Sequence, residues 1–556
     1  MRRAPHQPSS YLLQPNPTIS TVDVSFFFHS TAMDSPVVTQ LFRQLFRRPH
    51  PACLARPNLV NLATALHHGR QLRALSSGRG GDSTRGSIST SEKERGWQQR
   101  SNVYPKEKSE ELERYPLVTA KELRSYKERP RRVRMLMRDF IEDSLYNPHY
   151  GYFSKQVVIF TPGAPFDFPH IRDELEFHSL LSARFSEFED TLDAHQPSDT
   201  RQLWYTPTEL FRPYYGEAIA RYLCENYRHT TFPYHDLIIY EMGAGRGTLM
   251  LNILDHIRAV EPEVYERTKY KVIEISSNLA SVQASSLAAT AESRGHRGKV
   301  EIINKSIFDW RDPVPSPCFF LAFEVFDNFA HDVIRYDLAT EEPLQGTVLI
   351  DAEGDFYDFF APVTDPLVAR FLRLRHIATE GVYPLPYYSR SGLGLPKQER
   401  WAARMVRRVR EGLRRKSGDG LSEPEYLPTR LMGFFETLER YFPNHQLLTS
   451  DFHSLPEAIG GLNAPIVQTR YRRRPVPVST PMVHQGYFDI MFPTDFETME
   501  AIYRSITGKL SRVRSHEDFM RSWAYVEDCE TQNGENPLLS WYQNASVMMT
   551  WNYRKI

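Results

Sequence analysis

Short apolar runs and apolar residues at helical spacing alternate through the middle of the chain. Residues 237–240 form an apolar run with the length and β-branched content of a buried parallel strand. A turn with three glycines follows, and then apolar residues at helical spacing: Leu249, Met250, Ile253, Leu254 and Ile257. A strand, a glycine turn and a helix in this order predict the opening unit of a nucleotide-binding α/β fold.

Further strand-like runs each end near an acidic residue. The runs are 270–273, 300–303 and 318–322, and the acids that follow them are Glu274, Asp309, Glu324 and Asp327. Open α/β sheets bind ligands at the carboxyl ends of their strands. Four successive strands that each deliver a glycine turn or an acid to this edge therefore predict a nucleoside-type ligand. A fifth strand is expected at 446–449.

The glycine turn has the spacing E-x-G-x-G-x-G, with Glu241 before Gly243, Gly245 and Gly247. A dinucleotide fingerprint would place the third glycine five residues after the first, whereas here it lies four after. The observed form is typical of S-adenosylmethionine (SAM) methyltransferases. In that interpretation Glu241 orients the loop, Glu274 accepts hydrogen bonds from the ribose hydroxyls and Asp309 meets the adenine amino group. The simpler alternative is a tight turn without a ligand.

The first 100 residues predict a mitochondrial leader. Residues 35–81 contain seven arginines but no lysine, aspartate or glutamate, and the apolar residues of 37–46 fall on one helical face. An amphipathic, arginine-rich and acid-poor leader is typical of a mitochondrial transit signal. A disordered basic tail is the alternative. We expect a linker at 76–101 and a location in the mitochondrial matrix.

Composition and net charge narrow the possible partners and the possible kinds of site. The chain of 556 residues has 68 basic and 68 acidic residues, so its net charge predicts neither nucleic acid nor an acidic membrane surface as partner. No run approaches 18 apolar residues, so no membrane span is expected. The four cysteines form no C-x-x-C pair and suggest reduced thiols. The 19 histidines are scattered, and we expect no metal site.

Other segments carry weaker patterns. We expect a capped helix that opens at Thr119, helices at 132–146, 214–227, 371–380 and 431–441, and an irregular acidic segment at 154–203. The aromatic stretch 145–153 is a packed turn or a cofactor lid. A basic helix at 397–416 is a solvated face, or else a docking surface for an acidic partner or RNA. The aromatic tail should be packed or serve in docking.

These segments predict five parts of the chain. They are a transit peptide and linker at 1–100, an N-terminal helical region with an acidic insertion at 101–230, a cofactor-binding core at 231–345, a helical insertion at 346–445, and the C-terminal part of the same domain with the aromatic tail at 446–556.

Several motifs together resemble those of the MidA-like methyltransferase family. The pattern L-x-x-P-x-Y-G-Y-Y is matched at 145–153, T-S-P-E-I at 206–210, F-G-E at 215–217, E-x-G-P-G-R-G-T-L at 241–249, V-E-x-S-x-x-L-x-x-x-Q at 273–283, A-N-E-F-F-D-A-L-P at 322–330 and D-L-T-x-x-V-D-F at 489–496. The animal mitochondrial member of this family is a complex I assembly factor that forms symmetric dimethylarginine. The resemblance runs from about residue 130 to about residue 510.

The resemblance implies a Rossmann-like SAM methyltransferase fold with a mostly parallel seven-stranded sheet, N-terminal helices and inserted helical segments. It implies SAM as the cofactor and an arginine on a respiratory complex I subunit as the acceptor. A guanidinium acceptor needs carboxylates that fork onto it. Glu324 and Asp327 are therefore the first candidate catalytic residues, and Glu209 is the third. Helix capping or a loop ion pair is the plainer role for these three acids.

The chain departs from the family pattern on the acceptor side. Phe323 stands where the family has asparagine, the G-x-x-G-D-F that precedes T-S-P-E is absent, and residues 451–453 read D-F-H instead of D-Y-G. Two other functions therefore stay open. One is methylation of a small molecule or RNA, and the other is a non-catalytic assembly scaffold that retains the fold.

Overall fold

The computed structural model describes residues 98–100, 108–155, 157–274, 287–379, 420–456 and 459–552. All of them belong to one compact unit, 49–556. The leader, the stretch of the family motif at 275–283 and the basic helix at 397–416 lie outside the described residues.

A seven-stranded sheet carries the glycine turn. Its order is β17 (Leu510–Ser515), β18 (Ala545–Trp551), β13 (His445–Phe452), β8 (Cys318–Phe323), β5 (Leu237–Met242), β6 (Thr268–Glu274) and β7 (Val300–Asn304). The five strands from β13 to β7 are parallel, and β18 runs antiparallel to both of its neighbours. The fold is therefore the expected Rossmann-like one. Strand order reverses between β5 and β8, and such a switch point is where these sheets bind ligands.

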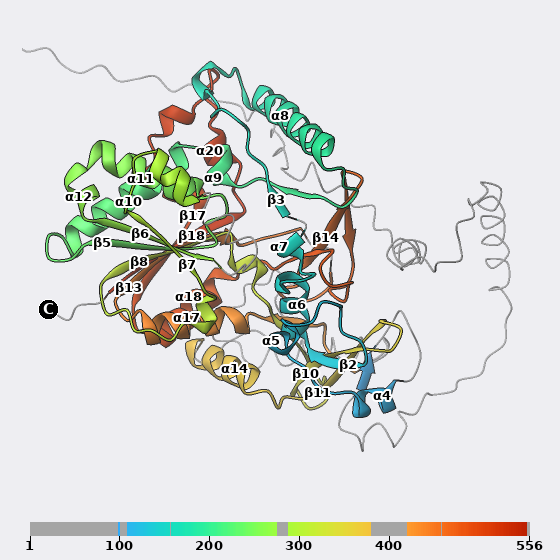
Figure 1. The fold of residues 1–556 in the computed structure, drawn as a ribbon. Coiled ribbons are helices and arrows are strands. Elements are labelled where there is room, and N and C mark those ends of the chain that lie inside the picture. Colours follow the sequence, from blue (N-terminus) through green and yellow to red (C-terminus); the bar gives the residue numbers. More distant parts are fainter. Residues whose placement is uncertain are drawn as a thin grey trace, which may run out of the picture. The chain divides into compact units, whose positions relative to one another are not determined.

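Helices cover both faces of this sheet. Figure 1 shows α10 (Tyr214–Thr230) and α11 (Thr248–Val260) on one side, and α17 (Thr429–Tyr441) and α18 (Phe496–Thr507) on the other. Alternate residues of each strand supply the two cores, because successive side chains of a strand point to opposite faces. In β5, Ile239 packs into the core under α11, and Tyr240 packs into the core under α17.

The strong patterns of the sequence are confirmed. The runs at 237–240, 270–273, 300–303, 318–322 and 446–449 lie in β5, β6, β7, β8 and β13, and the helices at 214–227 and 431–441 lie in α10 and α17. The helix expected at 371–380 begins earlier, as α14 (Pro366–Ala378). Thr119 makes the predicted capping box at the start of α5 (Ala120–Leu123). Two described elements precede Thr119: β1 (Gln98–Arg100), at the end of the linker expected at 76–101, and α4 (Ser109–Arg114).

The single helix predicted at 132–146 is wrong in its first part. Residues Val133–Leu136 form strand β2, and only Met137–Tyr146 form a helix, α6. β2 pairs antiparallel with β10 (Pro343–Ile350), and its side chains alternate between buried and partly exposed. Pairing with β10, far along the chain, stabilises the strand conformation of these residues, although their local pattern also fits a helix.

The segment expected to be irregular, 154–203, is ordered. It contains α7 (Tyr152–Lys155), the parallel pair of β3 (Val157–Ile159) and β4 (Gln202–Trp204), and a helix of 22 residues, α8 (Glu174–His195). Only Phe177, Leu181 and Glu189 of α8 are buried, so the helix shows little apolar periodicity in the sequence. Asp173 caps its N-terminus by accepting a hydrogen bond from the backbone of Glu176.

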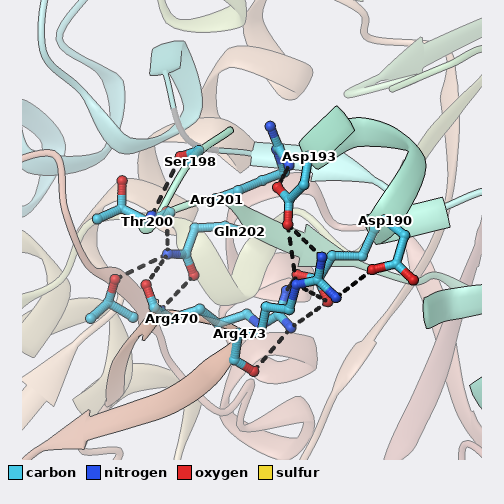
Figure 2. A network of polar contacts seen from close by, with 10 residues as sticks. Asp190, Asp193, Ser198, Thr200, Arg201, Gln202, Arg470 and Arg473 are labelled. Carbon is cyan, nitrogen blue, oxygen red and sulfur yellow. Dashed lines mark hydrogen bonds and ion pairs between the residues drawn. The ribbon is translucent and has the colours of Figure 1, made fainter. Parts of the chain in front are cut away.

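Ion pairs hold the end of α8 against a C-terminal hairpin, which is formed by β14 (Ile466–Tyr471) and β15 (Arg474–Val478). Figure 2 shows Arg470 and Arg473 reaching this end of the helix. Arg470 binds both carboxylate oxygens of Glu189, at 3.0 and 3.3 Å. Arg473 binds Asp190 at 2.7 Å and Asp193 at 2.6 Å. The insertion is thus fastened to a part of the chain more than 260 residues away.

The part predicted as a helical insertion, 346–445, also contains strands. A second sheet has the order β1 (Gln98–Arg100), β11 (Phe356–Pro362), β10, β9 (Asp332–Tyr336) and β12 (Glu425–Leu427), with β2 beside β10. It therefore combines residues from four of the five predicted parts, and its strand β1 lies inside the transit peptide and linker expected at 1–100. In the sequence, α14 follows β11 and α17 follows β12. The boundaries between the parts remain predictions.

The aromatic tail is packed in part, whereas its Tyr525 is 60% exposed. Trp541 and Tyr542 are buried beside Phe177 of α8 and Phe211. The remaining elements are α9 (Pro207–Leu210), α12 (Pro262–Glu266), β16 (Asp489–Met491), α19 (His516–Trp523) and α20 (Pro537–Ser540). Over the described ranges, no helix has both the length and the apolar character that crossing a membrane would require.

Candidate functional site

The glycine turn between β5 and α11 has a backbone that other residues rarely adopt. Gly243, Gly245 and Gly247 have φ angles of 74°, 53° and 76°. Gly247 is the N-cap of α11, and no side chain caps the helix there. The first N–H groups of a helix lack partners within the helix, so this end can receive an anionic group.

Glu241 supports this turn from inside the sheet. Its carboxylate is buried and accepts a hydrogen bond from the Tyr270 hydroxyl at 2.7 Å. Burial raises the pKa of Glu241 to about 7, the bond from Tyr270 opposes this rise, and the charge of Glu274 adds to it. Glu241 is thus fixed to the neighbouring strand β6 behind the glycines.

Glu274 and Asp309 lie where the sequence predicts them, at the carboxyl ends of neighbouring strands. Glu274 is the last residue of β6 and is paired with Asn304 at the end of β7. Asp309 follows β7 in a short 3-10 helix (Ile307–Asp309), and its carboxylate accepts a hydrogen bond from Arg124 at 3.3 Å. The roles of both acids toward ribose and adenine remain predictions.

Four acidic side chains gather at the ends of β8, β13 and β16, and we call them the carboxylate cluster. They are Glu324, Asp327, Asp451 and Asp489. The sequence predicts the first two as candidates, whereas the structure adds the last two. Each carboxyl has a raised pKa, and burial is the largest cause in every case. None of the groups that shift these pKa values most is a lysine or an arginine.

Asp451 shapes the loop that presents Glu324 and Asp327. One of its oxygens, Oδ2, accepts hydrogen bonds from the backbone N–H groups of Val325, Phe326 and Asp327, at 3.2, 2.8 and 3.3 Å. The backbone of Glu324 has a φ of 53°, which is uncommon for a residue with a side chain. The Asp451 carboxylate therefore holds a strained turn at the end of β8.

Asp327 and Asp489 complete the cluster from two directions. Asp327 is 4% exposed, and its Oδ1 atom has no hydrogen-bond partner within the described part of the chain. Asp489 accepts a hydrogen bond from the Asn328 amide at 2.9 Å. It also bonds with the Tyr152 hydroxyl, which accepts a hydrogen bond from the Trp204 indole N–H at 2.9 Å. The cluster thus has a buried acceptor atom that a ligand could use.

The sequence held weak signals for the two added acids. Asp489 opens the matched motif at 489–496, and Asp451 opens the segment that departs from D-Y-G. Asp451 follows the strand expected at 446–449, so the rule that selected Glu324 could have selected it too, whereas Asp489 follows none of the predicted strands.

Glu209, the third candidate, lies beside the glycine turn. Its carboxylate is buried, accepts a hydrogen bond from the Thr248 hydroxyl at 2.5 Å and bonds to Arg212 at 3.4 Å. Thr248 is the first residue of α11. Glu209 is therefore placed to orient the start of this helix, and a direct role toward the acceptor stays a prediction.

The paired strands β3 and β4 also reach the glycine turn and the carboxylate cluster. A Cβ atom built on Gly245 would lie 2.8 Å from the Ile159 side chain of β3. The neighbouring strand β4 contributes Trp204, which is linked through Tyr152 to Asp489. The insertion therefore runs from the glycine turn to the carboxylate cluster.

These residues fit SAM. The glycines allow close approach of a ligand, the uncapped end of α11 suits the carboxylate of its methionine part, and Glu274 lies at the strand end that would hold ribose. The carboxylate cluster lies at the end of β8, which pairs directly with β5. Cofactor and acceptor sites would therefore be neighbours at one edge of the sheet. Over the described residues, no group of three or more metal-ligating side chains is found.

Comparisons with known proteins agree with this geometry. A family model described as "Putative S-adenosyl-L-methionine-dependent methyltransferase" matches residues 218–514. The mitochondrial protein arginine methyltransferase NDUFAF7 homolog of Schizosaccharomyces pombe is 25% identical over 392 residues, which cover 69% of this chain and 79% of the yeast protein.

Two crystal structures of proteins from Burkholderia thailandensis, the first of them bound to S-adenosyl-homocysteine, match with TM-scores of 0.46 and 0.43. Their identities are 16% and 14%, and the matches cover 75% of this chain and 88% and 87% of theirs. Since the family model spans more than half of the sequence, the chain belongs to this family of SAM-dependent methyltransferases, and its cofactor is SAM.

Proposed function

We propose that this protein transfers methyl groups from SAM to arginine side chains of a protein in the mitochondrial matrix. The product is symmetric dimethylarginine, and the acceptor is a subunit of respiratory complex I during assembly. The observation that carries the proposal is the carboxylate cluster, in which a buried oxygen of Asp327 lacks a partner among the described residues.

A guanidinium cation would supply the positive charge that the carboxylate cluster lacks among the main influences on its pKa values. Four carboxyl groups lie close enough to raise one another's pKa values or to share bonding partners, and no lysine or arginine is among the main influences on them. Burying such charges is costly unless a cation joins them. A planar guanidinium can bond to two carboxylates at once, which an ammonium group or a neutral hydroxyl cannot do equally well.

The side chains of the cluster have distinct roles in this proposal. SAM supplies the electrophilic methyl group, so the protein contributes positioning and electrostatics. Glu324 and Asp327 accept hydrogen bonds from the guanidinium and turn one nitrogen toward the methyl group. Asp451 keeps the loop of these two acids in place through its three backbone bonds.

The cellular setting rests on two observations. The relative from Schizosaccharomyces pombe is named as a mitochondrial protein arginine methyltransferase, and it covers most of this chain. The arginine-rich, acid-free stretch at 35–81 has the composition of a transit signal. The complex I subunit is proposed from the family resemblance of the motifs at 145–153, 241–249 and 322–330.

The test is methyl transfer to mitochondrial proteins. The full chain is incubated with methyl-labelled SAM and matrix proteins, and hydrolysed arginine derivatives are separated by mass spectrometry. We expect symmetric dimethylarginine on a complex I subunit, and a loss of about 100-fold or more in rate for Glu324→Gln or Asp327→Asn. The control is Glu500→Gln on α18, where the carboxylate accepts a hydrogen bond from Ser511 at 2.9 Å and lies outside the carboxylate cluster. Label found on RNA or on small molecules would assign a different acceptor class.

One observation favours the scaffold alternative. The Ile159 side chain packs against Gly245 of the glycine turn, 2.8 Å from the place of an added Cβ, and so fills space beside the turn. Calorimetric titration of the full chain with SAM decides between the two, with Gly245→Asp as the negative control. Binding that this variant abolishes supports the enzyme, whereas a folded chain that binds no SAM supports the scaffold.

A further inference from the structure

Arg212 lies beside the glycine turn without a complete set of partners. It stands between α9 and α10, and its guanidinium donates to the carbonyl of Gly163 and bonds to Glu209 at 3.4 Å. Its Nε atom is buried and has no hydrogen-bond partner within the described residues. Within the described part of the chain, one edge of this guanidinium is therefore shielded from water and has no hydrogen-bond partner.

The contact with Glu209 brings Arg212 to the start of α11. The second oxygen of Glu209 accepts a hydrogen bond from the Thr248 hydroxyl at 2.5 Å, and Thr248 is the first residue of that helix. Two hydrogen bonds through Glu209 thus link Arg212 to Thr248, the first residue of α11, beside the N–H groups of the helix N-terminus. The Glu209 carboxylate is one anion between this positive side chain and the positive end of the helix dipole, and a second anion there would be stabilised by both.

Apart from Glu209, the charges that most influence Arg212 are positive. Burial is the largest influence on its pKa and lowers it, Glu209 opposes this effect, and Arg246 of the glycine turn and Arg184 lower the pKa further. Arg184 donates hydrogen bonds to the carbonyls of Pro162 and Ala164, which carry no charge to neutralise it. The single carboxylate of Glu209 therefore leaves this corner of the site positive.

We propose that Arg212 binds the carboxylate of the methionine part of SAM. Its unbonded Nε and a neighbouring Nη form the fork that an arginine offers to a carboxylate. Glu209 is a positioning residue in this arrangement, because it holds both Arg212 and the start of α11. The inference rests on the cofactor of the family and not on the acceptor proposed above, so the two can fail separately.

The experiment compares SAM with decarboxylated SAM, which lacks only the group that Arg212 should bind. Both are titrated into the full chain by calorimetry. We expect the wild-type chain to bind SAM about 10- to 100-fold more tightly, the range for hydrogen bonds to a charged group. In Arg212→Gln this preference should disappear, because SAM binds more weakly while the affinity for decarboxylated SAM changes less than about twofold. Arg212→Lys should retain part of the preference as a point charge.

The control is Arg258→Gln, further along α11, where the guanidinium is paired with Asp255. It should leave both affinities unchanged. Equal weakening of both ligands by Arg212→Gln would overturn the proposal, because Arg212 would then only support the fold through Glu209 and Gly163. A folded wild-type chain that binds the two ligands equally, or binds neither, would overturn it without any variant.

Discussion

The raised pKa of Glu324 can be tested by measuring how the free energy of unfolding depends on pH. Burial, with the charge of Asp451 as the second cause, raises the pKa of Glu324 from the ordinary value of 4.5 to about 8. Between these two pH values the folded protein binds one proton more than the unfolded chain. The free energy of unfolding should therefore fall as the pH rises from about 5 to about 8.

The magnitude follows from the two pKa values. Their difference corresponds to about 5 kcal/mol at 1.36 kcal/mol per pKa unit. The side chain of Glu324 is only partly buried, so water screens some of this effect. We expect the contribution of Glu324 to fall by about 2–4 kcal/mol over this pH range.

The assay is urea unfolding at pH 5, 6, 7 and 8 for the wild-type chain and for Glu324→Gln. Glutamine keeps the shape of the side chain but cannot ionise. The variant should therefore gain about 2–4 kcal/mol relative to the wild type as the pH rises to 8. Glu500→Gln should instead run parallel to the wild type. If the free energy of unfolding changed with pH equally in Glu324→Gln and in the wild type, the reasoning would be refuted. Glu324 would then have the same pKa in the folded and the unfolded protein.

Perturbations at three further positions test how the site and the insertion are held in place. Asp451→Ala removes the acceptor of four backbone N–H groups, three of them in the loop after β8, and should cost about 3 kcal/mol in urea unfolding. Asp451→Asn should cost about half as much, and equal costs would contradict the bonding described. Arg470→Met removes a bidentate bond to the buried Glu189 and should lower the free energy of unfolding by about 1–2 kcal/mol. Arg473→Gln breaks an exposed pair, so any loss of stability should vanish in 0.5 M salt, and a loss that persists would assign that side chain a packing role.

The central α/β unit could be predicted because its signals are local. β5 is an apolar run of the right length, and the glycines that follow adopt the positive φ angles their presence suggests. α11 shows its apolar side in the sequence because its buried face is broad. A buried strand or helix of this kind depends little on what happens elsewhere in the chain.

The insertion could not be predicted because its stabilising contacts are distant. α8 buries only three residues, and its C-terminal end is held by Arg470 and Arg473 of a hairpin about 280 residues later. β2 looked helical because Val133, Leu136 and Met137 suit a helix face as well as a strand. Its pairing with β10 decides between these conformations, and no local pattern reports that pairing.

The candidate site likewise combines residues that a local pattern predicts with residues that only the fold brings together. Glu324 and Asp327 follow an obvious strand, so a rule about strand ends finds them. Asp451 joins them because β13 lies next to β8, with Ser450 opposite Phe323. Asp489 joins them through β16, which lies outside the main sheet. The order of strands in space, which the sequence does not state, assembles these acids.

Phe323 bears on whether the acceptor side can work. Where the family pattern has asparagine, this ring packs edge-on against Tyr215, with centroids 6.2 Å apart. The polar group lost there is therefore replaced by packing and leaves no unpaired amide. An amide does reach the carboxylate cluster from Asn328, which donates to Asp489 at 2.9 Å. Because the unpartnered oxygen of Asp327 lies in the same loop, the groups that could bind a guanidinium are retained after position 323 even though that position has changed.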